Sequence, residues 1–162
     1  MTEQDHEQES VWDYPRPPRL EPSGEQVEVV LGGVVVARTS RSLRLLETSH
    51  PPTYYLPLAD FTDGSLRPAD GGGSTFCEWK GQAAYLDVVG GGVVASRAAW
   101  YYPTPTASYA AILDHVALYP GLMDRCTVDG EVVQPQPGGF YGGWVTSRVV
   151  GPFKGGPGTW GW

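Results

Sequence analysis

Cysteine is scarce in this sequence, which has only Cys77 and Cys126 among its 162 residues. The two lack the paired Cys-x-x-Cys spacing of a zinc site, and they are too few to form the framework of a disulfide-stabilised domain. No P-loop or other cofactor motif is present either. We therefore expect no metal, no cofactor and no disulfide.

Long apolar runs and positive charge are also in short supply. No stretch approaches the length needed to cross a bilayer, and the first residues lack the basic and apolar regions of a signal peptide. Lys and Arg number 11 against 18 Asp and Glu, a net charge of −7. An acidic surface repels phosphate backbones. We expect a cytoplasmic protein that binds neither membranes nor nucleic acid.

Glycine and proline are abundant, with 22 and 15 residues. This excess disfavours long helices and favours short strands joined by tight turns, so we predict a mainly β chain. The length suits one compact domain. We divide it into an extended N-terminal segment (1–26), a β domain (27–137) and a glycine- and aromatic-rich C-terminal extension (138–162), which we expect to pack on the domain as ordered coil.

Alternating apolar runs predict hairpins over 27–38, 74–89 and 126–133, each with glycine in its turn. Further strands are predicted over 43–47, 53–56, 93–101 and 116–119. Because Pro51 and Pro52 precede it, the strand over 53–56 is expected at a sheet edge. The stretch 108–115 has a capping Ser108 and good helix formers, so it is the one predicted short helix, with His115 at its end.

Three polar groups suggest chemistry, and each has a simpler interpretation. Lys80 at a hairpin tip could hold an anion or be a solvated turn residue. Cys77 could be a reactive thiol or a small buried side chain. Asp129 and Glu131 resemble a metal-binding carboxylate pair, but Asp-Gly is also a favoured hairpin turn.

Tryptophan is unusually frequent, with six residues. Trp79, Trp100 and Trp144 lie in segments expected to be structured. Three such rings could form a cage for a flat or cationic ligand, or they could simply fill the core. Both interpretations stay open.

Several motifs occur in a fixed order along 27–162. They are Glu47 with Pro52 and Tyr54-Tyr55-Leu56-Pro57, Asp60, Thr75-x-Cys77-x-Trp79-Lys80-Gly81-x-Ala83-x-Tyr85, Ala99-Trp100-x-Tyr102-Pro103, and Val128-Asp129-Gly130. Together they resemble the domain of unknown function family 427. The ending, from Gly139 to Gly155, is similar to an extension in one branch of that family. Arg38 and the Leu58-Ala59 pair depart from the family pattern.

The resemblance implies a small β-tent-like domain of two sheets meeting at an angle. Zinc-binding relatives of that architecture carry Cys-x-x-Cys pairs, which this chain lacks. The family has also been labelled nucleotidyltransferase-like, and only the Asp129-Gly130-Glu131 spacing points that way here. Fold similarity by itself confers no function.

Our leading functional prediction is a small-molecule-binding domain, catalytic or not, with an aromatic- and lysine-lined pocket between the sheets. A non-catalytic protein-interaction or scaffolding module is the alternative, and a thiol-dependent reductase is a third. We expect a monomer or homodimer. The predicted ligand-binding residues are Glu47, Asp60, Cys77, Trp79, Lys80, Tyr85, Trp100 and Tyr102.

Overall fold

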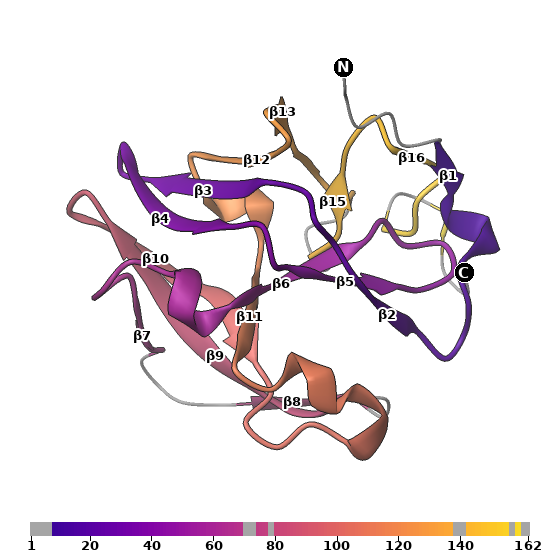
Figure 1. Ribbon diagram of the computed structural model, residues 1–162, viewed down its shortest axis with the longest axis horizontal. Coiled ribbons are helices and arrows are strands. Elements are labelled where there is room, and N and C mark those ends of the chain that lie inside the picture. Colours follow the sequence, from indigo (N-terminus) through magenta and orange to yellow (C-terminus); the bar gives the residue numbers. More distant parts are fainter. Residues whose placement is uncertain (1–7, 70–73, 78–79, 138–141, 156–157, 160–162) are drawn as a thin grey trace.

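A computed structural model describes residues 8–69, 80–137, 142–155 and 158–159, and the backbone of 74–77. The chain is mainly β, with several sheets and only short 3-10 turns besides, as the composition predicts (Figure 1). None of the helices among these residues has the length and apolar character that crossing a membrane requires.

The larger sheet is antiparallel throughout and runs in the order β2-β5-β6-β11-β10-β9-β7, with β8 also paired to β9. Its strands are β2 (Arg19–Pro22), β5 (Leu43–Leu46), β6 (Thr53–Pro57), β7 (Leu66–Pro68), β8 (Ser74–Cys77), β9 (Gly81–Gly90), β10 (Val93–Tyr101) and β11 (His115–Leu118).

The smaller sheet, in the order β13-β12-β3-β4, packs over part of the larger one. Its strands are β3 (Val27–Leu31), β4 (Val34–Thr39), β12 (Arg125–Val128) and β13 (Glu131–Val132). The β3–β4 hairpin forms where the sequence predicts it. Gly32 and Gly33 both have a positive φ, of 62° and 79°, which residues other than glycine rarely adopt.

Two further strand pairs and four 3-10 turns complete the part of the fold that the structure describes. They are β1 (Glu9–Ser10) with β16 (Val149–Val150), β14 (Gln134–Pro135) with β15 (Trp144–Val145), and the turns η1 (Val11–Asp13), η2 (Leu58–Asp60), η3 (Ala107–Ile112) and η4 (Pro120–Leu122).

One local prediction is wrong, and a second differs from the structure in its helix type and its end. The strand over 53–56 is central, because β6 pairs with β5 on one side and β11 on the other. The prolines that suggested an edge precede the strand and remove no donor from its middle. The predicted helix over 108–115 is a 3-10 segment, η3, interrupted at Tyr109. His115 begins β11 instead of ending a helix.

Two apolar clusters occupy the two faces of the large sheet. One lies between the sheets and includes Val29, Leu56, Ala99 and Leu118, all buried. The other lies on the opposite face, where Tyr55 and Ala117 pack with η3. Because side chains alternate along a strand, β6, β10 and β11 each contribute to both clusters.

The described residues near both ends of the chain pack on this body. Strand β1 runs parallel to β16, at the right of Figure 1. Trp144 from the glycine-rich end is fully buried in the core between the sheets, with its ring 4.9 Å from that of Tyr54. The Trp12 indole donates to the carbonyl of Pro152 at 2.9 Å.

Candidate functional site

The register of the large sheet brings several aromatic rings together. Tyr85 on β9 lies directly opposite Trp100 on β10. The Trp100 ring centre is 4.7 Å from that of Tyr119, and Tyr102 shares the same apolar cluster as Trp100. We call Tyr85, Trp100, Tyr102 and Tyr119, with the cations beside them, the aromatic face.

Two cations lie against these rings. The Arg97 guanidinium is 4.4 Å from the centre of the Tyr85 ring, and Lys80 Nζ is 5.7 Å from that of Tyr102. Both distances are within the range of cation–π attraction. The aromatic face therefore combines flat apolar surfaces with two positive charges.

Backbone geometry determines where Arg97 points. The β9–β10 register shifts between Ala95 and Ala99, and inside this irregularity Arg97 takes φ of 52°. Its N–H donates to a carboxylate oxygen of the buried Asp87 at 2.9 Å. A left-handed arginine in a bulge is unusual, and bulges often re-aim a side chain. The sequence alone carries no signal of this bulge.

The residues of the aromatic face differ in how far they are exposed to water. Tyr102 is buried, whereas Tyr85, Trp100, Tyr119 and Lys80 are only half-buried. A Cβ at Gly142 would overlap the Trp100 ring, so the C-terminal extension approaches that ring as closely as a backbone can. Rings that remain partly open to water can contact a ligand.

Four of the eight predicted binding residues, namely Lys80, Tyr85, Trp100 and Tyr102, therefore meet on one sheet face. Arg97 and Tyr119 were not predicted. Tyr119 was read only as the end of a strand, and Arg97 as part of one, because sequence spacing cannot tell which strands become neighbours.

Glu47 and Asp60 are engaged elsewhere. Glu47 follows β5 and lies 3.6 Å from Arg16 and 4.0 Å from His50. Asp60 is on η2, where it pairs with Arg41 at 2.7 Å. Hydrogen bonds from Arg41 lower the pKa of the Asp60 carboxyl. The cations that pair with these two carboxylates are Arg16 and Arg41, neither of which belongs to the aromatic face.

Of the two cysteine side chains, only that of Cys126 lies among the described residues. The backbone of Cys77 pairs with Gly81, while the Cys77 side chain and the whole of Trp79 lie outside the described residues. Cys126 is buried in the main core, and burial raises the pKa of its thiol to about 12. Such a thiol is a packing group, not a nucleophile at neutral pH.

The Asp129 and Glu131 carboxylates have structural partners. Asp129 accepts from the N–H of Gln26 at 2.7 Å, and Glu131 accepts from both the N–H and the hydroxyl of Ser147, each at 2.7 Å. Within the described part of the chain, no group of three acidic, histidine or cysteine side chains could hold a metal. The hairpin interpretation of the Asp-Gly dipeptide accounts for these residues.

A buried ionic cluster joins both ends of the chain to the sheet. Arg44 on β5 is completely buried and pairs with Glu9 at 2.7 Å and Glu21 at 3.1 Å. Arg148 pairs with Glu9 at 3.2 Å and Glu25 at 3.1 Å. Burial alone would raise the pKa of Glu9, but hydrogen bonds from Arg44 and Tyr14 outweigh it and lower that pKa to about 2. The cluster is a structural tie, because its charges are paired with one another.

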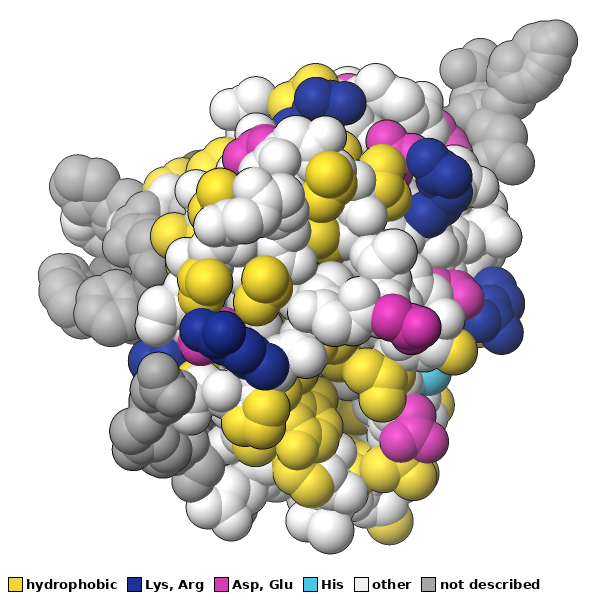
Figure 2. All heavy atoms as spheres, turned by 90° about the vertical axis from the view of Figure 1, so that its left-hand side faces the viewer, with side chains coloured by type: hydrophobic (Ala, Val, Ile, Leu, Met, Phe, Trp, Pro, Cys, Tyr) yellow, Lys and Arg dark blue, Asp and Glu magenta, His cyan; other side chains and the backbone are white. Residues whose placement is uncertain are grey.

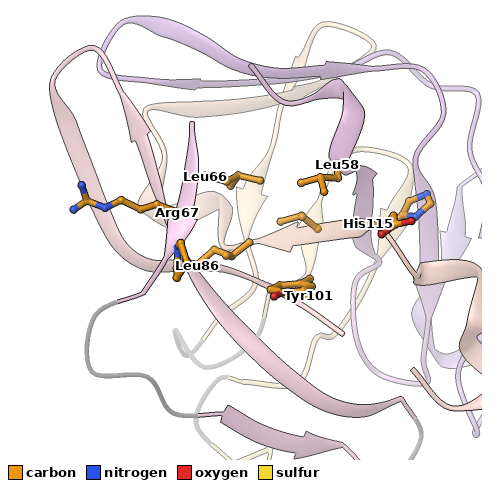
Figure 3. A pocket seen from close by; sticks show the side chains of 9 residues that line it. Leu58, Leu66, Arg67, Leu86, Tyr101 and His115 are labelled. Carbon is orange, nitrogen blue, oxygen red and sulfur yellow. The ribbon is translucent and has the colours of Figure 1, made fainter. Parts of the chain in front are cut away.

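An apolar cavity of about 260 Å³ opens on the face of the large sheet opposite the aromatic face (Figure 3). Figure 2 shows apolar side chains gathered in the lower half of the surface that carries β7 and η2. None of the lining residues was predicted as a site, because they come from segments far apart in the sequence. They are Leu58, Leu66, Arg67, Pro68, Leu86, Tyr101, Asp114, His115 and Val116.

Comparison with known proteins identifies the family. No curated protein matches the chain. The model of a family described as a domain of unknown function (DUF427) matches residues 19–129. The match begins at β2 and covers the larger sheet and all of the smaller sheet except β13. It includes every described residue of the aromatic face. With more than half of its length matched, the chain belongs to the DUF427 family.

Proposed function

We propose that this protein binds a small planar anion on the aromatic face. One observation carries the proposal: two cations, Arg97 and Lys80, lie against rings of a sheet face on which Trp100 remains half-buried. The rings would stack on the flat part of the ligand, and the cations would neutralise its charge.

The charge of the site favours an anion over a cation. The protein as a whole is acidic, so a surface with two neighbouring cations stands out from its surroundings. Asp87, which contacts the Arg97 backbone, is also 3.4 Å from Arg67. Asp87 is therefore engaged by two arginines, by Arg97 through its backbone and by Arg67 through its side chain.

The two alternatives have less support. The aromatic, proline-rich start and the glycine-aromatic end of the chain favour a scaffolding role. However, Tyr14 is buried, and the Trp12 indole donates to the carbonyl of Pro152 in the same chain. A thiol-dependent reductase needs a reactive and a resolving cysteine. Cys126 is unsuited to either task because burial keeps it protonated.

Titration calorimetry with 1-naphthoate tests the proposal. We expect binding by the wild-type protein and an approximately tenfold loss of affinity in the double variant Lys80→Gln/Arg97→Gln, because each lost charge contact is worth about 0.5–1 kcal/mol at a half-exposed site. NMR should show the Trp100 indole resonance shifting as the carboxylate is added.

Arg38→Gln/Arg125→Gln is the matched control, since it removes the same charge from exposed positions on the smaller sheet. It should bind 1-naphthoate within about twofold of wild type, because exposed distant charges are screened by salt. Equal affinity in the two double variants, or a Trp100 resonance that stays in place, would refute the proposed site.

A further inference from the structure

We infer that the cavity of Figure 3 is a second binding site, which takes a small apolar compound bearing a protonated amine. The inference goes beyond the function proposed above and does not depend on it. It rests on the lining of the cavity, its size and the charge at its mouth.

The body of the cavity is apolar and continuous with the core. Leu66, Leu86 and Tyr101 pack against the cluster between the sheets, and Val116 belongs to that cluster. Leu58 contributes from η2 and keeps 48% of its surface exposed. When a ligand displaces water from such an apolar floor, the free energy falls, and this favours binding.

The volume indicates the size of the ligand. A cavity of roughly 150 Å³ lined by apolar side chains accommodates benzene. The present cavity, of about 260 Å³, therefore suits a two-ring or phenylalkyl compound. It is open on one side, so that a polar group of the ligand can remain at the mouth.

The lining of the cavity includes one carboxylate, that of Asp114. Asp114 is exposed, and within the described residues its carboxylate enters no ion pair. The Leu58 N–H donates to the Asp114 carbonyl at 2.8 Å, which ties this residue to η2. His115 Nδ1 lies 2.9 Å from the carbonyl of Leu113, and a carbonyl oxygen can only accept, so Nδ1 is the donor of this hydrogen bond.

The guanidinium of Arg67 does not cancel the negative charge of Asp114 at the cavity. This group extends away from the other labelled side chains in Figure 3 and pairs with Asp87 at 3.4 Å. The Asp114 carboxylate therefore remains available at the cavity, and it complements an ammonium group.

The cavity and the aromatic face are separate sites. Leu86 and Tyr101 line the cavity, while their neighbours Tyr85 and Trp100 belong to the aromatic face. Adjacent residues of a strand point to opposite faces of its sheet. The two sites are therefore distinguishable by ligand charge and by the resonances that respond.

NMR titration of the full chain with 1-naphthylmethylamine tests the inference. The amine should shift the methyl resonances of Leu58, Leu66 and Val116, and 1-naphthoate should leave them in place. Asp114→Asn should weaken amine binding about three- to tenfold, because it removes the charge but keeps the shape. Asparagine also tolerates the φ of 61° at this position.

Asp63→Asn is the matched control, since Asp63 is an exposed acid near η2 that does not line the cavity. Its amine affinity should stay within about twofold of wild type. Leu58→Trp should block the cavity and abolish the methyl shifts of Leu66 and Val116. If that variant fails to fold, the methyl shifts of the wild-type protein with the amine still test the inference.

Three results would overturn the inference: no methyl shifts with the amine, equal binding of both naphthyl compounds at these methyl groups, or unchanged affinity in Asp114→Asn. None of them bears on the aromatic face, where the carboxylate is the reporting ligand. Failure of one site therefore leaves the other to be judged by its own titration.

Discussion

Arg38 and Arg44 show how surroundings decide what an ion pair contributes. Arg38 pairs with Glu28 at 2.7 Å, and its side chain is 61% exposed. Arg44 pairs with Glu9 at the same distance, and its side chain is completely buried. In water the first pair gains little, whereas a buried guanidinium is costly unless carboxylates neutralise it. Removing Arg44 should therefore destabilise the protein more than removing Arg38.

We expect Arg44→Met to lower the free energy of unfolding by about 2–4 kcal/mol, because it leaves Glu9 and Glu21 without their buried partner. Arg38→Met should cost less than about 1 kcal/mol. Urea unfolding monitored by circular dichroism measures both. Similar losses in the two variants would contradict the role given to burial.

Residue-scale chemistry was only partly visible in the sequence. Lys80 and Trp100 drew attention because lysine at a turn and frequent tryptophan are unusual. Arg97 did not, because its position over Tyr85 depends on a bulge and on a neighbouring strand. Composition ranks residue types, but it cannot report which side chains share a face.

At the scale of elements, two hairpin tips hold the sheets together. The β3–β4 turn meets the β9–β10 turn so closely that a Cβ on Gly91 would overlap the carbonyl of Gly32. Gly92, the next residue, also has positive φ but has open space around its Cβ position. These two glycines therefore separate backbone conformation from close packing.

Gly92→Ala should lower the free energy of unfolding by about 1–2 kcal/mol, the cost of a left-handed alanine. Gly91→Ala carries the same conformational cost and must also push the tips apart, so we expect a loss above about 3 kcal/mol. Thermal and urea unfolding of the two variants compare them directly. Equal losses would mean that the tip contact contributes nothing.

Strand positions followed from local pattern, but strand neighbours did not. The hairpin over 27–38 depends on a glycine turn and alternation within one short segment, and it forms as predicted. The pattern over 53–56 predicts an edge strand, although β5 and β11 flank β6. β11 lies far along the chain, so no local pattern contains that pairing.

For the whole molecule, the ionic cluster links the two chain ends to the sheet. Glu9 on β1 contacts Arg44 on β5 and Arg148 just before β16. Tyr14 donates to Glu9 at 2.6 Å. Loss of the Glu9 charge would therefore weaken the attachment of the N-terminal strand and of the C-terminal extension together.

Acid should destabilise the protein through this cluster. The pKa of Glu9 falls from 4.5 to about 2 on folding, and that of Glu25 is also lowered. Their contribution is fully present above about pH 4.5 and is lost as the pH falls toward 2. The difference in urea midpoint between wild type and Glu9→Gln should therefore shrink from pH 7 to pH 3. A difference that stays constant would contradict this assignment.

The sequence by itself determined that the chain is mainly β, where most strands and turns lie, and that it resembles its family. These properties depend on alternation, on glycine and proline, and on motifs within short segments. Only the tertiary structure decided that Arg97 and Lys80 share a ring-bearing face, and that an apolar cavity opens on the other side. Both sites combine distant segments, and their geometry follows from strand order and register, which no local pattern encodes.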